Sequence, residues 1–184
     1  LGSDRVITLN ATGNSTLTLP DSNGTLDRLE RAGNILQVVS TTKTSTSSFV
    51  NVNSSYTAQV PDLTVTITPS SASSKILIKG IVAFSTSDQI QNGVGVTLLR
   101  DGTEFAIGSA GNSNTRVSFA GYYSPDDDRL PQAIPFETLD APNSTSAITY
   151  GLKLFQPFSA NVTVYVNDNG DGLVSPTRCR STSV

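Results

Sequence analysis

The chain has 184 residues and a mass of 19.3 kDa, a length that predicts one ordinary domain and excludes a large multidomain enzyme. Hydrophobic residues make up 36% and charged residues 15%, while Ser, Thr and Asn fill about a third of the chain, which excludes a coiled coil and a highly charged disordered tail. The net charge of -3 leaves no basic field for phosphates, so we expect no nucleic-acid partner and no anionic membrane surface.

Missing residue types exclude several chemistries. Histidine is absent, which removes the commonest general base and metal ligand, and so excludes Ser-His-Asp and Cys-His catalysis and HExxH metal sites. Cys179 is the only cysteine, so no internal disulfide can form. No apolar run reaches the roughly 20 residues of a membrane-spanning helix, and residues 1–4 carry no signal-peptide pattern, so we expect a piece of a longer protein. We predict neither enzymatic activity nor a cofactor.

Residues 1–33 differ from the rest and are predicted to be a short β shaft or oligomerisation segment. Residues 5–9 and 16–19 alternate as two short strands. Strands of this length cannot stand alone, so they need partners from the body or from other copies of the chain. The pattern of residues 26–32 predicts one or two polar helical turns, which end at Gly33 and Asn34.

Residues 34–184 are predicted to form an all-β domain. The pattern predicts a hairpin turn, of type I′, at Asp101-Gly102, an exposed edge or loop at residues 40–48, and a long proline-punctuated connection at residues 124–142. Counting every segment gives about eight strands and no interior helix, which is typical of a β-sandwich or jelly roll. The clearest predicted strands are residues 35–39, 63–68, 76–85, 94–100, 116–123, 148–154 and 162–166.

Three stretches of the body, residues 33–40, 65–78 and 98–103, together resemble the C-terminal head domain of tailed-bacteriophage fibre proteins, especially those of marine and cyanobacterial phages. The distinctive parts are Thr-Ile-Thr-Pro-Ser from Thr66 and Leu-Leu-Arg-Asp-Gly-Thr from Leu98. Residues 7–9 and 17–26 resemble the short β repeats of fibre shafts. The resemblance implies a virion structural protein, a homotrimer with wound shafts and jelly-roll heads, whose heads bind and do not cut. Such heads end with a few further apolar residues that this chain lacks after Val184.

One loop resembles a calcium site. Residues 167–172 place oxygen-bearing side chains at alternate positions before a glycine, as a D-x-[DN]-x-[DN]-G loop does. The match is incomplete, because the first ligand is Asn167 and the position of the bidentate Glu holds Arg178. A hairpin turn is therefore the main interpretation, and a cation site formed by Asn167, Asn169 and Asp171 is the alternative.

The predicted ligand contact lies in the long connection. Tyr122 and Tyr123 lie close to Asp126, Asp127 and Asp128, where aromatic faces and acceptors for sugar hydroxyls coincide. A host surface glycan is the predicted ligand there. The alternatives are a tyrosine pair split between core and surface by strand alternation, and a solvated or cation-binding aspartate cluster. N-x-[ST] triplets arise by chance in so Ser- and Thr-rich a chain, with a glycosylated ectodomain as a minor alternative.

These observations lead to one functional expectation and two alternatives. The expectation is a trimeric phage tail-fibre or spike subunit in the virion that partners with itself and other virion proteins and attaches to the bacterial surface. A capsid decoration or head-fibre protein with no role in host recognition is the first alternative. A fibre-borne depolymerase is the second alternative and ranks last. Glycoside hydrolysis needs two carboxylates across a groove, and nothing in the sequence places the two acids outside turns, Glu104 and Glu137, in that way.

Overall fold

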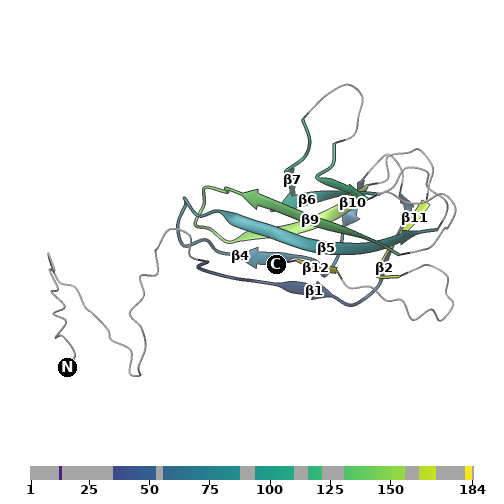
Figure 1. Ribbon diagram of the computed structural model, residues 1–184, viewed down its shortest axis with the longest axis horizontal. Helices are drawn as coiled ribbons and strands as arrows, with labels where there is room; N and C mark the ends of the chain where they lie inside the picture. Colours follow the sequence, from purple (N-terminus) through teal and green to yellow (C-terminus); the bar gives the residue numbers. More distant parts are fainter. Residues whose placement is uncertain are drawn as a thin grey trace, which may run out of the picture. The chain divides into compact units, whose positions relative to one another are not determined.

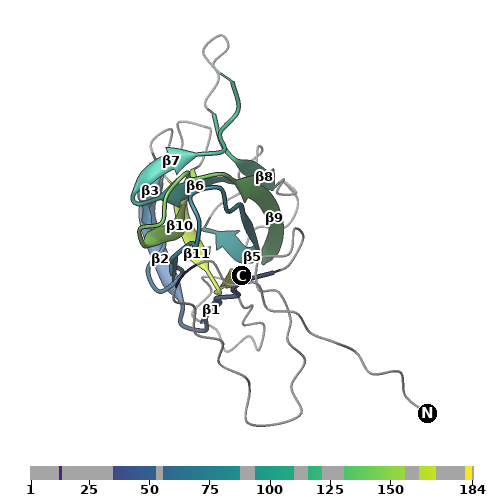
Figure 2. The same ribbon diagram turned by 90° about the vertical axis from the view of Figure 1, so that its left-hand side faces the viewer.

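The chain folds as a β-sandwich of two antiparallel sheets, with no helix among the described residues (Figures 1 and 2). The computed structural model describes residues 13, 35–52, 56–87, 94–109, 116–121, 131–155, 162–168 and 181–183. The predicted all-β class and the β-sandwich are therefore confirmed. The strands in this part are β1 Thr41–Lys43, β2 Ser47–Val52, β3 Tyr56–Gln59, β4 Val65–Ile67, β5 Ile76–Thr86, β6 Val94–Arg100, β7 Thr103–Phe105, β8 Phe119–Gly121, β9 Gln132–Asp140, β10 Ile148–Phe155, β11 Val162–Val166 and β12 Ser181–Ser183.

The first sheet, here called the β5 sheet, is built on its longest strand. One side of β5 pairs with β9 along nine residues, from Ile76 opposite Asp140 to Phe84 opposite Gln132. The other side pairs with β11 and β12, which follow one another along β5. Beyond them lie β2, paired with β11, and β1, paired with β12. The sheet thus has four columns, in the order β9, β5, β11 with β12, and β2 with β1.

The second sheet, the β6 sheet, is also four columns wide. Strands β6 and β10 form its centre and pair over six residues. Outside β10 lie β3 and β4, and outside β6 lie β7 and β8. In both sheets, therefore, several columns consist of two strands that lie end to end.

The core lies between the two sheets and follows from alternation along the strands. In β10, Ile148, Tyr150, Leu152 and Leu154 are buried at every second position, as expected when one face of a strand points into a core. The inward residues of β5, β6, β9 and β11 meet them in one cluster. Burial of this apolar surface is the main favourable term for the fold.

The predicted hairpin is confirmed. Strands β6 and β7 are joined by Asp101 and Gly102 alone, and Arg100 pairs with Thr103. Both turn residues have positive φ, 48° at Asp101 and 78° at Gly102, as a type I′ turn requires. The Asp101 side chain also accepts a 2.8 Å hydrogen bond from the backbone N–H of Thr149, which fixes the turn to the next column.

The long connection predicted at residues 124–142 is wrong in its second half, because Gln132–Asp140 is β9. Pro135 lies inside this strand, and proline usually argues against a strand because it lacks an N–H. Among the described strands, β9 pairs with β5 alone and on one side, so it is an edge strand there, where proline is tolerated. The connection from β8 to β9 therefore shortens to residues 122–131.

The prediction of a strand at residues 35–39 is also wrong, because these residues pair with no described strand. Residues 35–40 join no sheet, and Ile35 and Val38 are 81% and 66% exposed. Two predicted strands begin later than expected: within residues 63–68 the strand is β4, and within the described part of residues 116–123 it is β8. Lys43, expected in an exposed segment, is 1% exposed.

Two ends of the sandwich can be distinguished from the register. At the Thr86 end of β5, four connections leave or enter the sheets, namely residues 53–55, 87–93, 122–131 and 156–161. The chain enters β1 from the opposite end, because β1 is parallel to β5 and Thr41 lies level with Gly80.

By its contacts the chain divides into two units, Leu1–Leu36 and Gln37–Val184. The predicted shaft, residues 1–33, lies outside the described residues apart from Gly13.

Candidate interaction surface

Apolar side chains are exposed on the outward face of the β5–β9 ladder. Leu77 lies directly opposite Leu139, and these side chains are 50% and 59% exposed. Ile81, opposite Pro135, is exposed as well. Because residues opposite one another in a ladder share a face, they form an apolar stripe along the two strands.

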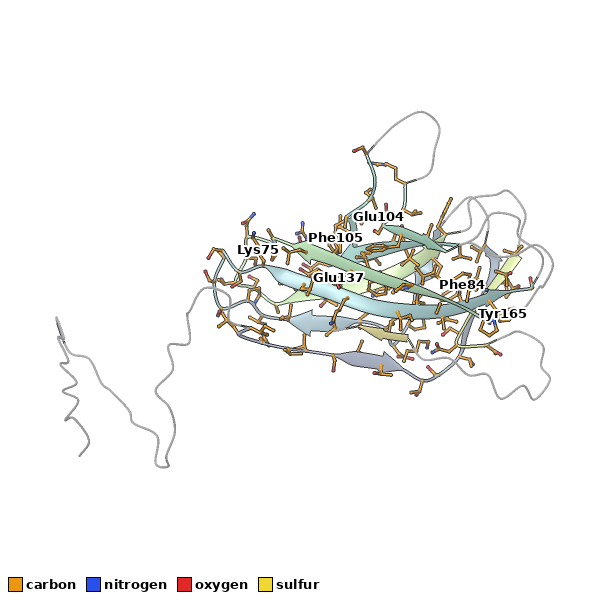
Figure 3. All side chains as sticks on the ribbon, viewed as in Figure 1. Lys75, Phe84, Glu104, Phe105, Glu137 and Tyr165 are labelled. Atoms are coloured by element: carbon orange, nitrogen blue, oxygen red, sulfur yellow. The ribbon has the colours of Figure 1, made fainter. Side chains whose placement is uncertain are left out.

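A charged pair and a hollow interrupt this stripe. Lys79 and Glu137 lie opposite one another between the two apolar pairs, and Glu137 is labelled in Figure 3. A hollow of about 450 Å³ lies at the same ladder, lined by residues of β5 and β9 and by Phe119 of β8. The hollow is a shallow depression that is open to solvent and not an enclosed cavity.

The chain covers only one half of this outward face. Toward the Thr86 end of β5, the outward residues Ala83 and Ser85 are buried, and the Ser85 hydroxyl donates a 2.6 Å hydrogen bond to the carbonyl of Asp168. Toward the Ile76 end, Leu77 and Ile81 remain exposed. A strand with apolar residues on both faces is typical of a strand covered on both sides. Half of β5 thus lacks the cover that its sequence predicts.

A polar cluster joins the two sheets at the same end. Arg100 of β6 contacts Asp140 of β9 through Nη1, at 3.0 and 3.1 Å from the two carboxylate oxygens. The Tyr150 hydroxyl donates a 2.6 Å hydrogen bond to Asp140 Oδ2. The Arg100 guanidinium also lies 5.7 Å from the centre of the Phe105 ring. Both carboxylate oxygens are therefore engaged by neighbouring donors.

The surroundings of this cluster shift the pKa of Tyr150. Burial, the hydrogen bond to Asp140 and its negative charge raise the pKa of Tyr150 well above its usual value. The tyrosine therefore stays protonated at neutral pH and holds its hydrogen bond.

A second polar cluster lies where the edge column of the β5 sheet breaks. Asn167 follows β11 with φ of 57°, and its side-chain amide donates hydrogen bonds to the carbonyls of Lys43 (2.9 Å) and Ser45 (3.2 Å). The buried Lys43 ammonium donates to Ser45 Oγ at 2.7 Å and lies 3.6 Å from Asp62 Oδ2. Since Asp62 lies between β3 and β4, this contact also links the two sheets.

The residues predicted to contact a glycan fall outside the described residues. Tyr122, Tyr123, Asp126, Asp127 and Asp128 all belong to the connection between β8 and β9. Its flanking residues are described: Gly121 pairs with Val94, and Gln132 pairs with Phe84. These flanks place both ends of the connection at the Thr86 end of the sandwich.

The predicted cation ligands are only partly described. Asn167 is 1% exposed and uses its amide N–H groups on two carbonyls, while Asn169 and Asp171 lie outside the described residues. Among the residues that the structure describes, no three His, Cys, Asp or Glu side chains come together as a metal site would require. In the same part of the chain, no helix is long and apolar enough to cross a membrane.

Sequence reasoning did not identify the outward stripe or the Arg100 cluster. A signal for the stripe existed in β5, where residues 76–78 are apolar on consecutive positions. Because Pro135 favours a loop in the sequence, no local pattern indicates the partner residues on β9. The Arg100 cluster joins three strands far apart in sequence, so no local pattern indicates it.

The chain matches no family model, and no curated protein is similar to it at a significant level. Among solved structures, it is similar to a chain in the structure of infectious bursal disease virus, Gx strain, with 18% sequence identity and a TM-score of 0.24. The match covers 76% of this chain and 35% of the virus chain, so this chain spans about a third of that length. At this TM-score the similarity establishes neither a shared fold nor a shared function.

Proposed function

We propose that the chain is the head of a homotrimeric virion structural protein, a tail-fibre or spike subunit that attaches a tailed phage to its bacterial host. The observation that carries the proposal is the uncovered apolar stripe of Leu77, Ile81 and Leu139, where exposed apolar side chains gather on two neighbouring strands. Exposed apolar surface of this kind marks contact with another chain. The fibre-head resemblance of the sequence supports the identity of that partner as further copies of the chain.

The strand order supports a jelly-roll head. If the columns are numbered 1 to 8 in chain order, with β1 and β2 as the first and β11 and β12 as the last, the β5 sheet has the order 1-8-3-6. The β6 sheet has the order 2-7-4-5. Two interwound Greek keys give this arrangement, which is that of eight-stranded jelly rolls. Virus shells and fibres use such domains, and so do lectins, so the order supports a binding or structural role without choosing one chemistry.

The direction of the chain supports attachment by the loop end. Residues 37–40 enter β1 from the Ile76 end, while four connections, residues 122–131 among them, meet the sheets at the Thr86 end. Loops on a rigid scaffold are the usual carriers of binding residues. A head held through its entry strand therefore presents these connections away from the particle, and Tyr122, Tyr123 and Asp126–Asp128 remain our proposed contact.

The trimer is tested by charge substitutions on the stripe. Leu77→Asp and Leu139→Asp should convert a trimer to a monomer in sedimentation equilibrium at micromolar concentration, because each buries a charge in the interface. Val50→Asp is the matched control, since Val50 is 70% exposed on β2 at the opposite edge of the same sheet. A wild-type monomer, or dissociation by Val50→Asp alone, would reject the proposed interface.

Attachment is tested with the intact chain. Purified protein should compete with phage particles for adsorption to host cells, and replacing Tyr122 and Tyr123 by Ala and the three aspartates by Ser should abolish competition without changing the thermal melt. Competition that survives in the folded variant rejects this contact. If the wild-type trimer also fails to compete, the attachment role is wrong, and a shell decoration or head fibre becomes the leading alternative.

A further inference from the structure

Residues 35–39 have the composition of a buried strand but no strand partner. Four of the five are apolar: Ile35, Leu36, Val38 and Val39. Because both alternate faces carry apolar side chains, the sequence is typical of a strand covered on both sides. In the structure these residues join no sheet, and Ile35, Leu36 and Val38 are exposed. We call residues 35–39 the arm.

Strand β9 has one side on which no described strand pairs with it. It is nine residues long and pairs with β5 along its other side. Long unpaired edges are sites where a further strand adds. After Pro135, which lacks an N–H, five residues remain to Asp140, the same number as in the arm. Leu139, beside Leu77, exposes apolar surface next to this edge.

The arm cannot reach the edge of β9 in its own copy. Strand β1, which begins at Thr41, and β9 are the two outer columns of one sheet, three spacings apart. At about 4.8 Å per spacing, a strand added beyond β9 lies about 19 Å from β1. The two residue steps from Val39 to Thr41 span at most about 7 Å. An arm paired with β9 must therefore come from another copy.

We propose that the arm of one copy adds as a strand to the free edge of β9 in a neighbouring copy. This gives the arm its missing hydrogen bonds and lays apolar side chains beside Leu139 and the hollow near Phe119. The contact joins different surfaces of the two copies, so it is head-to-tail and closes into a ring when three copies complete a rotation. The inference rests on the proposed homotrimer and names the elements that hold it together.

The β9 edge is favoured over the other outer column of the same sheet by the side chains beside it. The outward residues of β1 and β2 include the polar Thr42 and Ser48, with Val50 as the exposed apolar one. An apolar arm laid there would face hydroxyl groups. At β9 it meets Leu139 and Pro135.

The test uses disulfide trapping in the full chain, with Cys179→Ser as the background. Gln37→Cys and Val38→Cys, adjacent residues that face opposite sides of a strand, are each made in one chain, and Glu137→Cys and Leu139→Cys in a second, differently tagged chain. Neighbouring strands bring Cα atoms within disulfide reach. After co-expression and mild oxidation, we expect a disulfide between the two tagged chains for at least one arm–β9 combination. With both cysteines in one chain, a covalent trimer should become the main band on a non-reducing gel.

Val50→Cys replaces the β9 cysteine as the matched control, and it should leave the chains unlinked. A link to Val50→Cys as strong as that to β9, or a link only within one chain, overturns the proposal. If sedimentation shows a trimer and no combination forms a disulfide, the pairing of the arm with β9 is rejected and the homotrimer is retained. If the background protein is monomeric, both the homotrimer and the arm exchange are rejected.

Discussion

Tyr150 on β10 donates its hydroxyl hydrogen bond to Asp140 on β9, at 2.6 Å, and thereby joins the two sheets across the Ile76 end of the core. Tyr150 is 3% exposed and the Asp140 side chain 10%, so this hydrogen bond is largely shielded from water. The third member, Arg100, is more exposed, so its ion pair contributes less than the hydrogen bond.

Removing the carboxylate should therefore cost more than removing the hydroxyl. Asp140→Ala leaves the buried Tyr150 hydroxyl without its acceptor, and we expect a loss of about 3 kcal/mol in the free energy of unfolding, against about 1–2 kcal/mol for Tyr150→Phe. Urea denaturation of both variants checks this order. Equal losses, or a smaller loss for Asp140→Ala, would mean that the carboxylate is held mainly by Arg100.

The same tyrosine gives a pH dependence. Its pKa is raised in the folded state, mainly by burial, and is near 10 in the unfolded chain. The stabilisation from this group is therefore complete below pH 10 and is lost as the pH rises toward the folded-state pKa, with a slope of up to about 1.4 kcal/mol per pH unit. Urea midpoints from pH 8 to 11 should fall less steeply in Tyr150→Phe than in the wild type. Parallel curves would contradict the assignment.

Asn167 should resist replacement for two separable reasons. Asn167→Ala removes the amide that donates hydrogen bonds to the Lys43 and Ser45 carbonyls. It also places alanine in the left-handed region, at φ of 57°, which alanine tolerates less well than asparagine or glycine does. Asn167→Gly loses the same amide but tolerates the backbone, so it should be more stable than Asn167→Ala by about 1 kcal/mol. Thermal melts of the pair measure the difference. A glycine variant no better than alanine would show that the backbone angle relaxes.

Thr97 should be improved by a substitution that removes its hydroxyl. Its Oγ1 is buried and has no hydrogen-bond partner among the residues that the structure describes. Thr97→Val replaces that hydroxyl with a methyl group and should raise the free energy of unfolding by about 1 kcal/mol. Thr66→Val is the control, because the exposed Thr66 hydroxyl forms a 2.9 Å hydrogen bond with the Thr149 hydroxyl. This substitution should not raise the free energy of unfolding. Destabilisation by Thr97→Val would indicate a bound water at this hydroxyl.

Local patterns predicted strands of two kinds, together with one turn of distinctive chemistry. Strand β5 follows from a long apolar run, β10 and β11 follow from alternation, and the Asp101-Gly102 hairpin follows from its turn residues; all are present. Strand β9 was missed because Pro135 suggests a loop, and only its position at an edge makes the proline harmless. The apolar pattern of residues 35–39 is that of a strand, but pairing depends on a partner strand, which local sequence does not supply.

The site was less predictable than the fold. Arg100, Asp140 and Tyr150 come together only through the register of β6, β9 and β10, which no short motif encodes. The stripe of Leu77 and Leu139 required β9 to be recognised first. The predicted contact residues, Tyr122, Tyr123 and Asp126–Asp128, and the cation candidates Asn169 and Asp171 stay predictions, since they lie outside the described residues.

The pairing of β1 with β12 sets the order in which this domain can be completed during synthesis. Thr42 lies opposite Thr182, and β1 has no other strand neighbour among the described residues. About 140 residues must therefore leave the ribosome after β1 before it can pair, which takes roughly 7–28 s at 5–20 residues per second. During that time β5 can already pair with β9, so one side of the sheet forms while its entry strand is still open to other chains.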